Sequence, residues 1–327
     1  MSKRPLLPLL IAAGLLLVAI NAAMGIWSHR LPFRIKLEQI RASHDANIVF
    51  VGNSLLDGRI DHDILARTAK SRCASLNSVN AALGAVDPPE QRLLFNYARR
   101  LNPGIRTVVV GFFDFQLTAS DNSRAVDLIG NRLVGVDRRF SAREVASAYN
   151  FGLVDRATME ILRWSPMAAY RGSAWKEVEL LRRSMGTMGM PAVATNSMGR
   201  VSDFAGLEAA DTQAFDKHAA DFLDNLNQFN RSYEWIFDQA ARSHTRVVLL
   251  LMPMSPYHRS AFYSRPAWPK YLAAIESLAA QRGYGVIDAS EWIPNDDDFA
   301  DHLHMTINAS KGFTARVGSA LTAMPDR

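Results

Sequence analysis

The chain has 327 residues, of which 48% are hydrophobic and 21% charged, so it is long enough for one large globular domain or one domain with an insertion. Its formal net charge of +5 is spread along the sequence without a long lysine or arginine run, which argues against nucleic acid as a partner. A single cysteine, Cys73, excludes a disulfide framework within the chain. Because Cys73 lies beside an apolar segment, we expect a buried, inert thiol.

An uncharged apolar run from Pro5 to Trp27 follows the basic pair Lys3-Arg4. The run is longer than the roughly 20 residues that cross a hydrocarbon core as a helix, so residues 1–29 are a predicted transmembrane anchor. The basic pair favours a cytoplasmic start, with the remaining chain outside the cytoplasmic membrane. A cleaved signal peptide is the alternative, because Asn21-Ala22-Ala23 is an acceptable cleavage site. Residues 30–46 form a predicted juxtamembrane linker.

Four apolar residues at 48–51 precede Gly52-Asn53-Ser54, a pattern that predicts a buried strand running into a tight turn. An amphipathic run over residues 60–65 predicts a helix after this turn. Ser54 is therefore expected at the carboxyl end of a strand, the edge of an open α/β sheet where ligands bind. An ordinary turn serine is the alternative interpretation.

The remaining pattern alternates strands and helices, which is typical of a doubly wound sheet. Further strands are predicted at 73–79, 107–112, 247–252 and 285–288, and helices at 88–101, 212–242 and 269–282. The predicted fold is a three-layer α/β/α domain over residues 47–327, with a five-stranded, mostly parallel sheet. Residues 115–210 interrupt the alternation and form a predicted insertion.

The insertion contains two features with a functional and a simpler interpretation. A Met-Gly-Ser stretch at 184–202 would be either a mobile lid over the site or, more simply, a variable surface loop. Arg132, Arg138 and Arg139 are candidates for recognising an anionic polymer, with a solvated surface as the simpler expectation.

A second motif, Asp301-His302-Leu303-His304, lies near the other end of the chain. It resembles the Asp-x-x-His block of the SGNH, or GDSL-like, hydrolase superfamily, and Gly52-Asn53-Ser54-Leu55 resembles its Gly-Asp-Ser-Leu block. The resemblance covers roughly residues 45–320 and implies an SGNH-like fold.

By this resemblance Ser54 is the nucleophile, His304 the general base and Asp301 the residue that orients His304. A serine hydroxyl needs a base to take its proton and a carboxylate to fix the tautomer of that base. His302 is expected to be a neighbour, because Phe299 stands where its acid would be. His258 is expected to be a loop histidine, since no acid stands at a readable spacing from it.

Two further blocks of the superfamily are incomplete here. No glycine falls cleanly at the oxyanion position of the loop at 80–85, and Phe113 replaces the oxyanion-binding asparagine in Gly111-Phe112-Phe113-Asp114. Losing one such donor typically lowers turnover by about 10²–10³. The remaining oxyanion or cleft candidates are Asn53, Ser78, Asn80 and Asp114, of which Asp114 has an ordinary turn cap as its alternative.

No metal or other cofactor is expected. Asp296, Asp297 and Asp298 lie close to two histidines, but three consecutive aspartates cannot all face one ion, and a solvated loop is the simpler interpretation.

The run Val110-Gly111-Phe112-Phe113-Asp114-Phe115 also resembles a variant found in membrane-anchored SGNH-like proteins of bacterial envelopes, among them relatives of polysaccharide O-acetylation factors. The resemblance implies a serine esterase or O-acyltransferase that acts on O-acyl, mainly acetyl, groups of envelope or exported glycans. It implies a single-pass bacterial inner-membrane protein whose large domain lies in the periplasm or otherwise outside the cytoplasmic membrane. The alternative is a non-catalytic accessory protein that binds a membrane-bound acyltransferase or an export partner.

Overall fold

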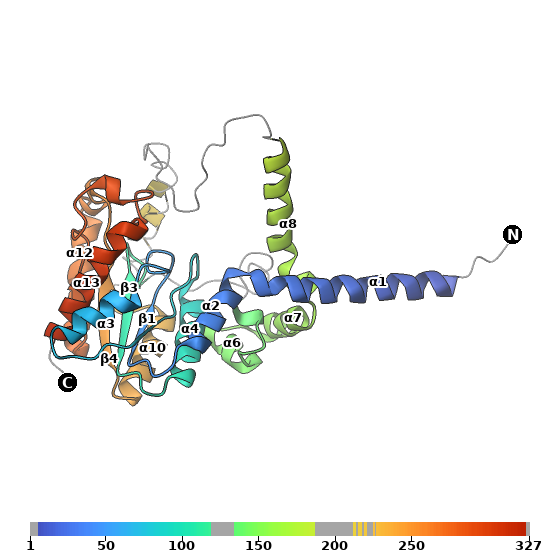
Figure 1. Cartoon of the computed structure of the whole chain (residues 1–327), viewed down its shortest axis with the longest axis horizontal. Coiled ribbons are helices and arrows are strands. Elements are labelled where there is room, and N and C mark those ends of the chain that lie inside the picture. Colours follow the sequence, from blue (N-terminus) through green and yellow to red (C-terminus); the bar gives the residue numbers. More distant parts are fainter. Residues whose placement is uncertain are drawn as a thin grey trace. The chain divides into compact units, whose positions relative to one another are not determined.

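The computed structural model describes residues 6–118, 134–186 and 227–324, together with 212, 213, 215–217, 219, 220 and 225 (Figure 1). The chain divides into two compact units. The first comprises Met1–Glu38 and Asn122–Ala192, and the second comprises Gln39–Asp121 and Val193–Arg327. Arg132 and most of the Met-Gly-Ser stretch at 184–202, from residue 187 onward, lie outside the described residues.

The second unit is built on a parallel sheet of five strands in the order β2-β1-β3-β4-β5. The strands are β1 Ile48–Val51, β2 Ser78–Asn80, β3 Thr107–Phe112, β4 Arg246–Leu251 and β5 Gly285–Asp288. The predicted five-stranded parallel sheet is thus confirmed. The order reverses between β1 and β3, which places the topological switch point at their carboxyl ends.

Both faces of this sheet are covered by helices, which explains why the sequences of its central strands are continuous apolar runs. The described helices of the second unit include α3 His62–Lys70, α4 Pro88–Leu101, α10 Arg231–Arg242, α11 Pro256–His258, α12 Ala267–Arg282 and α13 Ile307–Ala323. Figure 1 shows α3 and α13 together on one side of the strands, with α4 and α10 on the other. Alternate strand residues such as Phe50 and Val109 share a buried cluster with Leu65 of α3 and Phe313 of α13.

Local capping explains where two of these helices begin. Asp87 and Glu90 form a capping box at the start of α4, whose first two residues are prolines. The side chain of Asn230 accepts a hydrogen bond from the Ser232 N–H and caps α10. The single predicted helix at 212–242 is therefore wrong in its extent, because this cap begins a new helix at Arg231.

The predicted strand at 73–79 is also too long, since β2 begins only at Ser78. Cys73 lies in the preceding turn, where it adopts a left-handed backbone conformation with φ 59°. Its side chain is exposed, so the expectation of a buried thiol is wrong.

The first unit contains the apolar helix α1 Leu6–Trp27, which is long and apolar enough by length and composition to cross a membrane. It is followed by η1 Ser28–Arg30, α2 Pro32–Ala42, η2 Val134–Val136, α6 Ala142–Tyr149, α7 Leu153–Trp164 and α8 Pro166–Gly186, where α2 runs on into the second unit. The α7–α8 corner packs against the last turns of α1. There Asn21 Oδ1 accepts a hydrogen bond from the Met167 N–H at 3.1 Å.

A glycine in β3 lets the turn after β1 close over the sheet. A Cβ atom on Gly111 would lie 2.9 Å from Cδ2 of Leu56, a fully buried side chain in the turn that carries Ser54. We expect Gly111→Ala to destabilise the protein by about 1–3 kcal/mol, because Leu56 must move within a packed core. Thermal unfolding of the full chain in detergent, followed by circular dichroism, measures the effect.

The matched control is Gly104→Ala. Its Cβ would meet only the Ala46 carbonyl oxygen at 3.8 Å, an ordinary van der Waals contact, so its midpoint should stay near that of wild type. Equal midpoints for the two variants would contradict the close approach of Leu56 to β3.

Candidate active site

Ser54 lies in a tight turn directly after β1. The Asn53 carbonyl oxygen accepts hydrogen bonds from the Leu56 and Asp57 N–H groups at 3.1 and 3.0 Å. The Asn53 side chain accepts another from the Leu55 N–H at 3.0 Å. Leu56 is fully buried in the core, so the turn is fixed both by hydrogen bonds and by packing. Ser54 is thus held at the carboxyl edge of the sheet.

His304 reaches this serine from the loop that follows β5. Its Nε2 lies 2.9 Å from Ser54 Oγ, and its Nδ1 lies 2.9 and 2.8 Å from the two carboxylate oxygens of Asp301. The structure therefore brings together the three residues that the motifs single out, although Ser54 and His304 are 250 positions apart.

The Asp301 carboxylate is fixed by its own loop. Its Oδ1 accepts hydrogen bonds from the Leu303 and His304 N–H groups at 2.8 and 2.7 Å. Burial by itself raises the pKa of Asp301, but the hydrogen bonds and charge of His304 and the two backbone N–H groups outweigh it and lower the pKa to about 2.

This low pKa determines the tautomer of His304. The ionised Asp301 carboxylate accepts a hydrogen bond from the Nδ1–H of His304, so the ring carries a proton on Nδ1. Nε2 is then left as the acceptor for the Ser54 hydroxyl proton. A serine, a base with a free lone pair and an orienting carboxylate are the groups that nucleophilic catalysis on a carbonyl carbon requires.

A second polar chain holds the same loop from the other side. His258 Nε2 lies 3.0 Å from Asp114 Oδ1, and His258 Nδ1 lies 3.0 Å from Nδ1 of His302. His258 and His302 are 2% and 4% exposed. The expectation that His258 is a loop histidine without an acid is therefore wrong. Its partner acid comes from the loop after β3, 144 positions away.

Ser255 ties the end of β4 to the same loop. Its hydroxyl donates to the His302 carbonyl oxygen at 2.9 Å and accepts from the His258 N–H at 3.1 Å. The side chain is fully buried. The backbone of His302 is thus fixed between the two triad members Asp301 and His304.

A buried cation lies close to the carboxylates of the site. Arg59 is 1% exposed, and the charges of Asp57 and Asp301 act on it electrostatically. Burial lowers the pKa of Arg59, while the two carboxylates counteract this effect. The positive charge of Arg59 in turn favours the ionised form of Asp301.

The predicted oxyanion candidates occupy different places. Ser78 is the first residue of β2, at the amino edge of the sheet, and its Oγ lies within hydrogen-bond distance of His62 Nδ1, at 2.6 Å. It therefore does not line the carboxyl edge, where Ser54 lies. The Asn80 side chain donates to the Leu56 carbonyl oxygen and accepts from the Ala82 N–H, which fixes the loop after β2. Both side chains therefore hydrogen-bond within the protein.

The other candidates remain near the carboxyl edge. The Asn53 side-chain nitrogen lies 3.4 Å from Gln116 Oε1, in the loop that follows β3. Asp114 adopts a positive φ of 45° and is paired with His258 rather than capping a helix. Phe113 is partly buried and packs against the apolar core.

Gly84 is a functional candidate that the sequence did not reveal. A Cβ atom on it would lie 3.9 Å from the Ser54 Cβ, so this glycine borders the nucleophile. Its N–H donates to Asp57 Oδ2 at 2.9 Å. A glycine of the loop at 80–85 thus does lie beside Ser54, contrary to the expectation from the sequence. The signal in the sequence was that this loop consists of small residues. That pattern does not indicate which of them lies beside Ser54.

Within the described part of the chain, no group of three or more histidine, cysteine, aspartate or glutamate side chains could hold a metal ion. Asp296 Oδ1 instead accepts a hydrogen bond from the Tyr257 N–H at 3.2 Å.

Comparisons with known proteins find similarity only among solved structures. No protein-family model and no curated protein matches this chain. Similar structures include a lipase/acylhydrolase from Enterococcus faecalis (TM-score 0.37, 9% identity, 86% of this chain and 98% of that one). TesA is also similar (TM-score 0.37, 9% identity, 86% and 99%), as is a GDSL-like lipase from Bacteroides thetaiotaomicron (TM-score 0.32, 10% identity, 86% and 89%). At these scores the similarity assigns no activity to this chain.

Removing the Ser255 hydroxyl should loosen the loop that carries Asp301 and His304. Ser255→Ala leaves the buried His302 carbonyl oxygen and His258 N–H without this partner, so we expect a loss of about 1–3 kcal/mol in the free energy of unfolding. Denaturant unfolding measures it. The control is Ser260→Ala, whose exposed hydroxyl makes the same kind of bond to the Tyr257 carbonyl oxygen and should change stability by less than about 0.5 kcal/mol. Indistinguishable variants would contradict a structural role for Ser255.

The low pKa of Asp301 makes a prediction for acid stability. An unfolded aspartate titrates near pH 3.9, so the folded pKa of about 2 means that the ionised carboxylate stabilises the fold above about pH 4. This contribution is lost as the pH falls from about 4 to about 2. Unfolding free energy should therefore fall more steeply across that window in wild type than in Asp301→Asn.

Denaturant unfolding at a series of pH values between 5 and 2 (about one pH unit apart) tests this expectation. Asp238→Asn, on the exposed side of α10, is the control and should keep the wild-type slope. Parallel curves for wild type and Asp301→Asn would show that Asp301 is not stabilised in its ionised form.

Proposed function

We propose that this protein is a serine ester hydrolase or O-acyltransferase in which Ser54 carries the acyl group. The observation that supports this most is the continuous hydrogen-bonded chain from Ser54 Oγ through the His304 ring to the Asp301 carboxylate. A turn serine without a chemical role has no need of a base whose tautomer is fixed by an ionised aspartate.

The reaction begins with attack of Ser54 Oγ on an ester carbonyl carbon while His304 Nε2 takes the hydroxyl proton. The imidazolium that forms is stabilised by Asp301, which stays ionised because of its low pKa. His304 then returns the proton to the leaving alcohol, and an acyl-Ser54 ester remains. Attack by water on this ester gives hydrolysis, and attack by a sugar hydroxyl gives transfer.

The oxyanion that develops during attack needs N–H donors. The Ser54 N–H is one candidate, since within the residues described it donates to no other group. The Gly84 N–H is the second candidate, but the Asp57 carboxylate accepts its hydrogen bond at 2.9 Å. A substrate oxygen would have to displace that carboxylate. The Asn53 and Gln116 side-chain amides, which lie 3.4 Å apart, are the candidates to replace the amide absent at Phe113.

We extend the proposal to the substrate and its location. The apolar α1 suits a single-pass anchor in a bacterial inner membrane, with the site in the periplasm or otherwise outside the cytoplasmic membrane. Esters that lie there include O-acetyl groups on envelope and exported polysaccharides. Acylated glycan is therefore the substrate class that we propose.

One observation favours a second function. Phe113 stands where an amide donor is expected, and the Asp57 carboxylate accepts the hydrogen bond of the Gly84 N–H. Two of the expected contacts to the oxyanion are therefore altered. An accessory protein that binds a glycan, a membrane-bound acyltransferase or an export partner without turning over an ester would tolerate both changes. Reactivity of Ser54 distinguishes the two functions.

The decisive experiment treats the full chain in detergent with a fluorophosphonate probe and, in parallel, with p-nitrophenyl acetate. We expect labelling of Ser54 and ester turnover in wild type. Ser54→Ala should abolish both, and His304→Ala should lower turnover by about 10⁴-fold or more, because the hydroxyl then lacks its base.

Matched controls are Ser260→Ala and His44→Ala, which remove an exposed serine and an exposed histidine. Both should retain wild-type labelling and turnover. Failure of wild type to label, with its fold intact by circular dichroism, would overturn the catalytic function and support the accessory one. Acetylated glycan with mass detection of the released acetate or transferred acetyl group then separates hydrolysis from transfer.

A further inference from the structure

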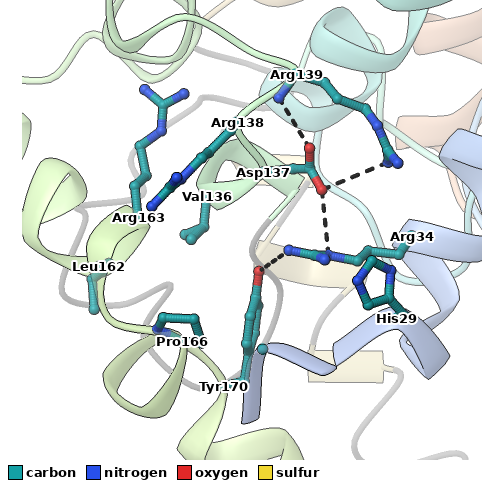
Figure 2. Close-up of a pocket in the computed structure, with 11 residues that line it drawn as sticks. His29, Arg34, Val136, Asp137, Arg138, Arg139, Leu162, Arg163, Pro166 and Tyr170 are labelled. Atoms are coloured by element: carbon teal, nitrogen blue, oxygen red, sulfur yellow. Dashed lines mark hydrogen bonds and ion pairs between the residues drawn. The ribbon is translucent and has the colours of Figure 1, made fainter. Parts of the chain in front are cut away.

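A second candidate site lies in the first unit, where the end of α1 meets the α7–α8 corner. It is an open cavity of about 560 Å³. Four arginines line it, namely Arg34, Arg138, Arg139 and Arg163, with His29 at its edge (Figure 2). Every residue that lines this cavity belongs to the first unit, whereas Ser54, Asp301 and His304 belong to the second.

The carboxylates near the cavity do not balance its arginines. Asp137 bridges Arg34 at 3.4 Å and Arg139 at 3.7 Å. Glu38 also pairs with Arg139, and Glu160 pairs with Arg163 at 3.2 Å. Four guanidinium groups thus face three carboxylates. Among the residues that the structure describes, one positive charge therefore remains in excess.

Arg138 is the least engaged of the four. Its guanidinium stacks over the Trp164 ring at 4.3 Å, a contact that leaves the N–H donors around its edge available. In the part of the chain that the structure describes, no carboxylate pairs with it. Figure 2 shows Arg138 and Arg163 on one side of the cavity and Arg34 and Tyr170 on the other. Arg138 therefore offers guanidinium donors for a phosphate group beside the other arginines of the cavity lining.

The position of the cavity along α1 indicates where such a phosphate would come from. Gly25, in the last turn of α1, and His29, just beyond it, both line the cavity. When α1 spans a bilayer, this end of the helix lies at the level of the lipid headgroups. Trp27 stands at the same level, as tryptophans of spanning helices commonly do.

The surface next to the cavity is apolar and exposed. Val154, Ala157, Ile161 and Trp164 follow a spacing of i, i+3, i+7 and i+10 on α7, which places them on one helix face. All four are exposed, Ile161 at 66% and Trp164 at 69%. An exposed apolar stripe on an amphipathic helix suits the boundary between headgroups and acyl chains.

We propose that this cavity binds the phosphate group of an anionic membrane lipid. The arginines take the phosphate oxygens, and α1 together with the apolar stripe of α7 contacts the acyl chains. A free phosphate ester shares the charge but not the acyl chains, so it should bind more weakly.

The test titrates the full chain, held in a neutral detergent, with four probes by calorimetry. Dihexanoyl phosphatidic acid carries both phosphate and acyl chains. Dihexanoylglycerol carries only the chains, whereas glycerol 3-phosphate and inorganic phosphate carry only the phosphate. We expect saturable binding of the phosphatidic acid, at least about tenfold weaker binding of both water-soluble phosphates, and no saturable binding of dihexanoylglycerol.

Substitutions then locate the site. Arg138→Gln should weaken phosphatidic acid binding by about tenfold or more, and Arg138→Lys by less, because lysine keeps the charge without the two-pronged geometry. Arg143→Gln is the matched control, since Arg143 is exposed on α6 and does not line the cavity. It should bind as wild type does. Ester turnover and probe labelling of Ser54 play no part in this readout.

Three results would overturn the proposal. Equal affinity of wild type and Arg138→Gln, with the fold intact, would remove the cavity as the site. Dihexanoylglycerol binding as tightly as the phosphatidic acid would remove the phosphate as the recognised group. Glycerol 3-phosphate binding as tightly would remove the lipid as its source.

Discussion

The five strands of the second unit all run in one direction, and the candidate active site depends on this constraint. A parallel ladder fixes the carboxyl ends of neighbouring strands at one edge. The edge receives Ser54 after β1, Asp114 after β3 and His258 after β4. The strand order switches between β1 and β3 at that edge, which is the position where ligands bind in open α/β sheets.

The loop after β5 shows how stability and chemistry share the same hydrogen bonds. Asp301 is fixed by N–H groups of its own loop, and His302 is fixed from the end of β4 by Ser255 and His258. Between these anchors His304 has little freedom to leave Ser54. In the proposed mechanism, a histidine held in this way needs no reorganisation before it takes the Ser54 proton, which is the physical basis of preorganisation.

The first unit depends on other forces. Its apolar surface is exposed along α1 and on one face of α7, while four of its arginines line a cavity beside both. In water an exposed apolar stripe is unfavourable, and a cluster of like charges repels itself. An anionic bilayer surface relieves both conditions at once. The proposed lipid site and the proposed anchor are therefore consistent with a single environment.

Local patterns were sufficient for much of the fold. The apolar, β-branched runs of β1, β3 and β4 predict buried strands, and the prolines and Glu90 of the capping box mark the start of α4. Where no local signal marked the end of an element, the predicted element was too long. The apolar periodicity before α10 continued through the cap at Asn230, which is visible only from its hydrogen bond to Ser232.

What the sequence determined by itself is therefore the order of the strands and helices and two short motifs that hold Ser54, Asp301 and His304. Only the tertiary structure decided which distant groups meet. It placed Gly84 beside Ser54 and paired His258 with Asp114, and it gathered four arginines of the first unit around one cavity. The physical reason is that propensity and periodicity act over a few neighbouring residues, whereas hydrogen-bond partners, burial and local charge depend on contacts between residues far apart in the chain.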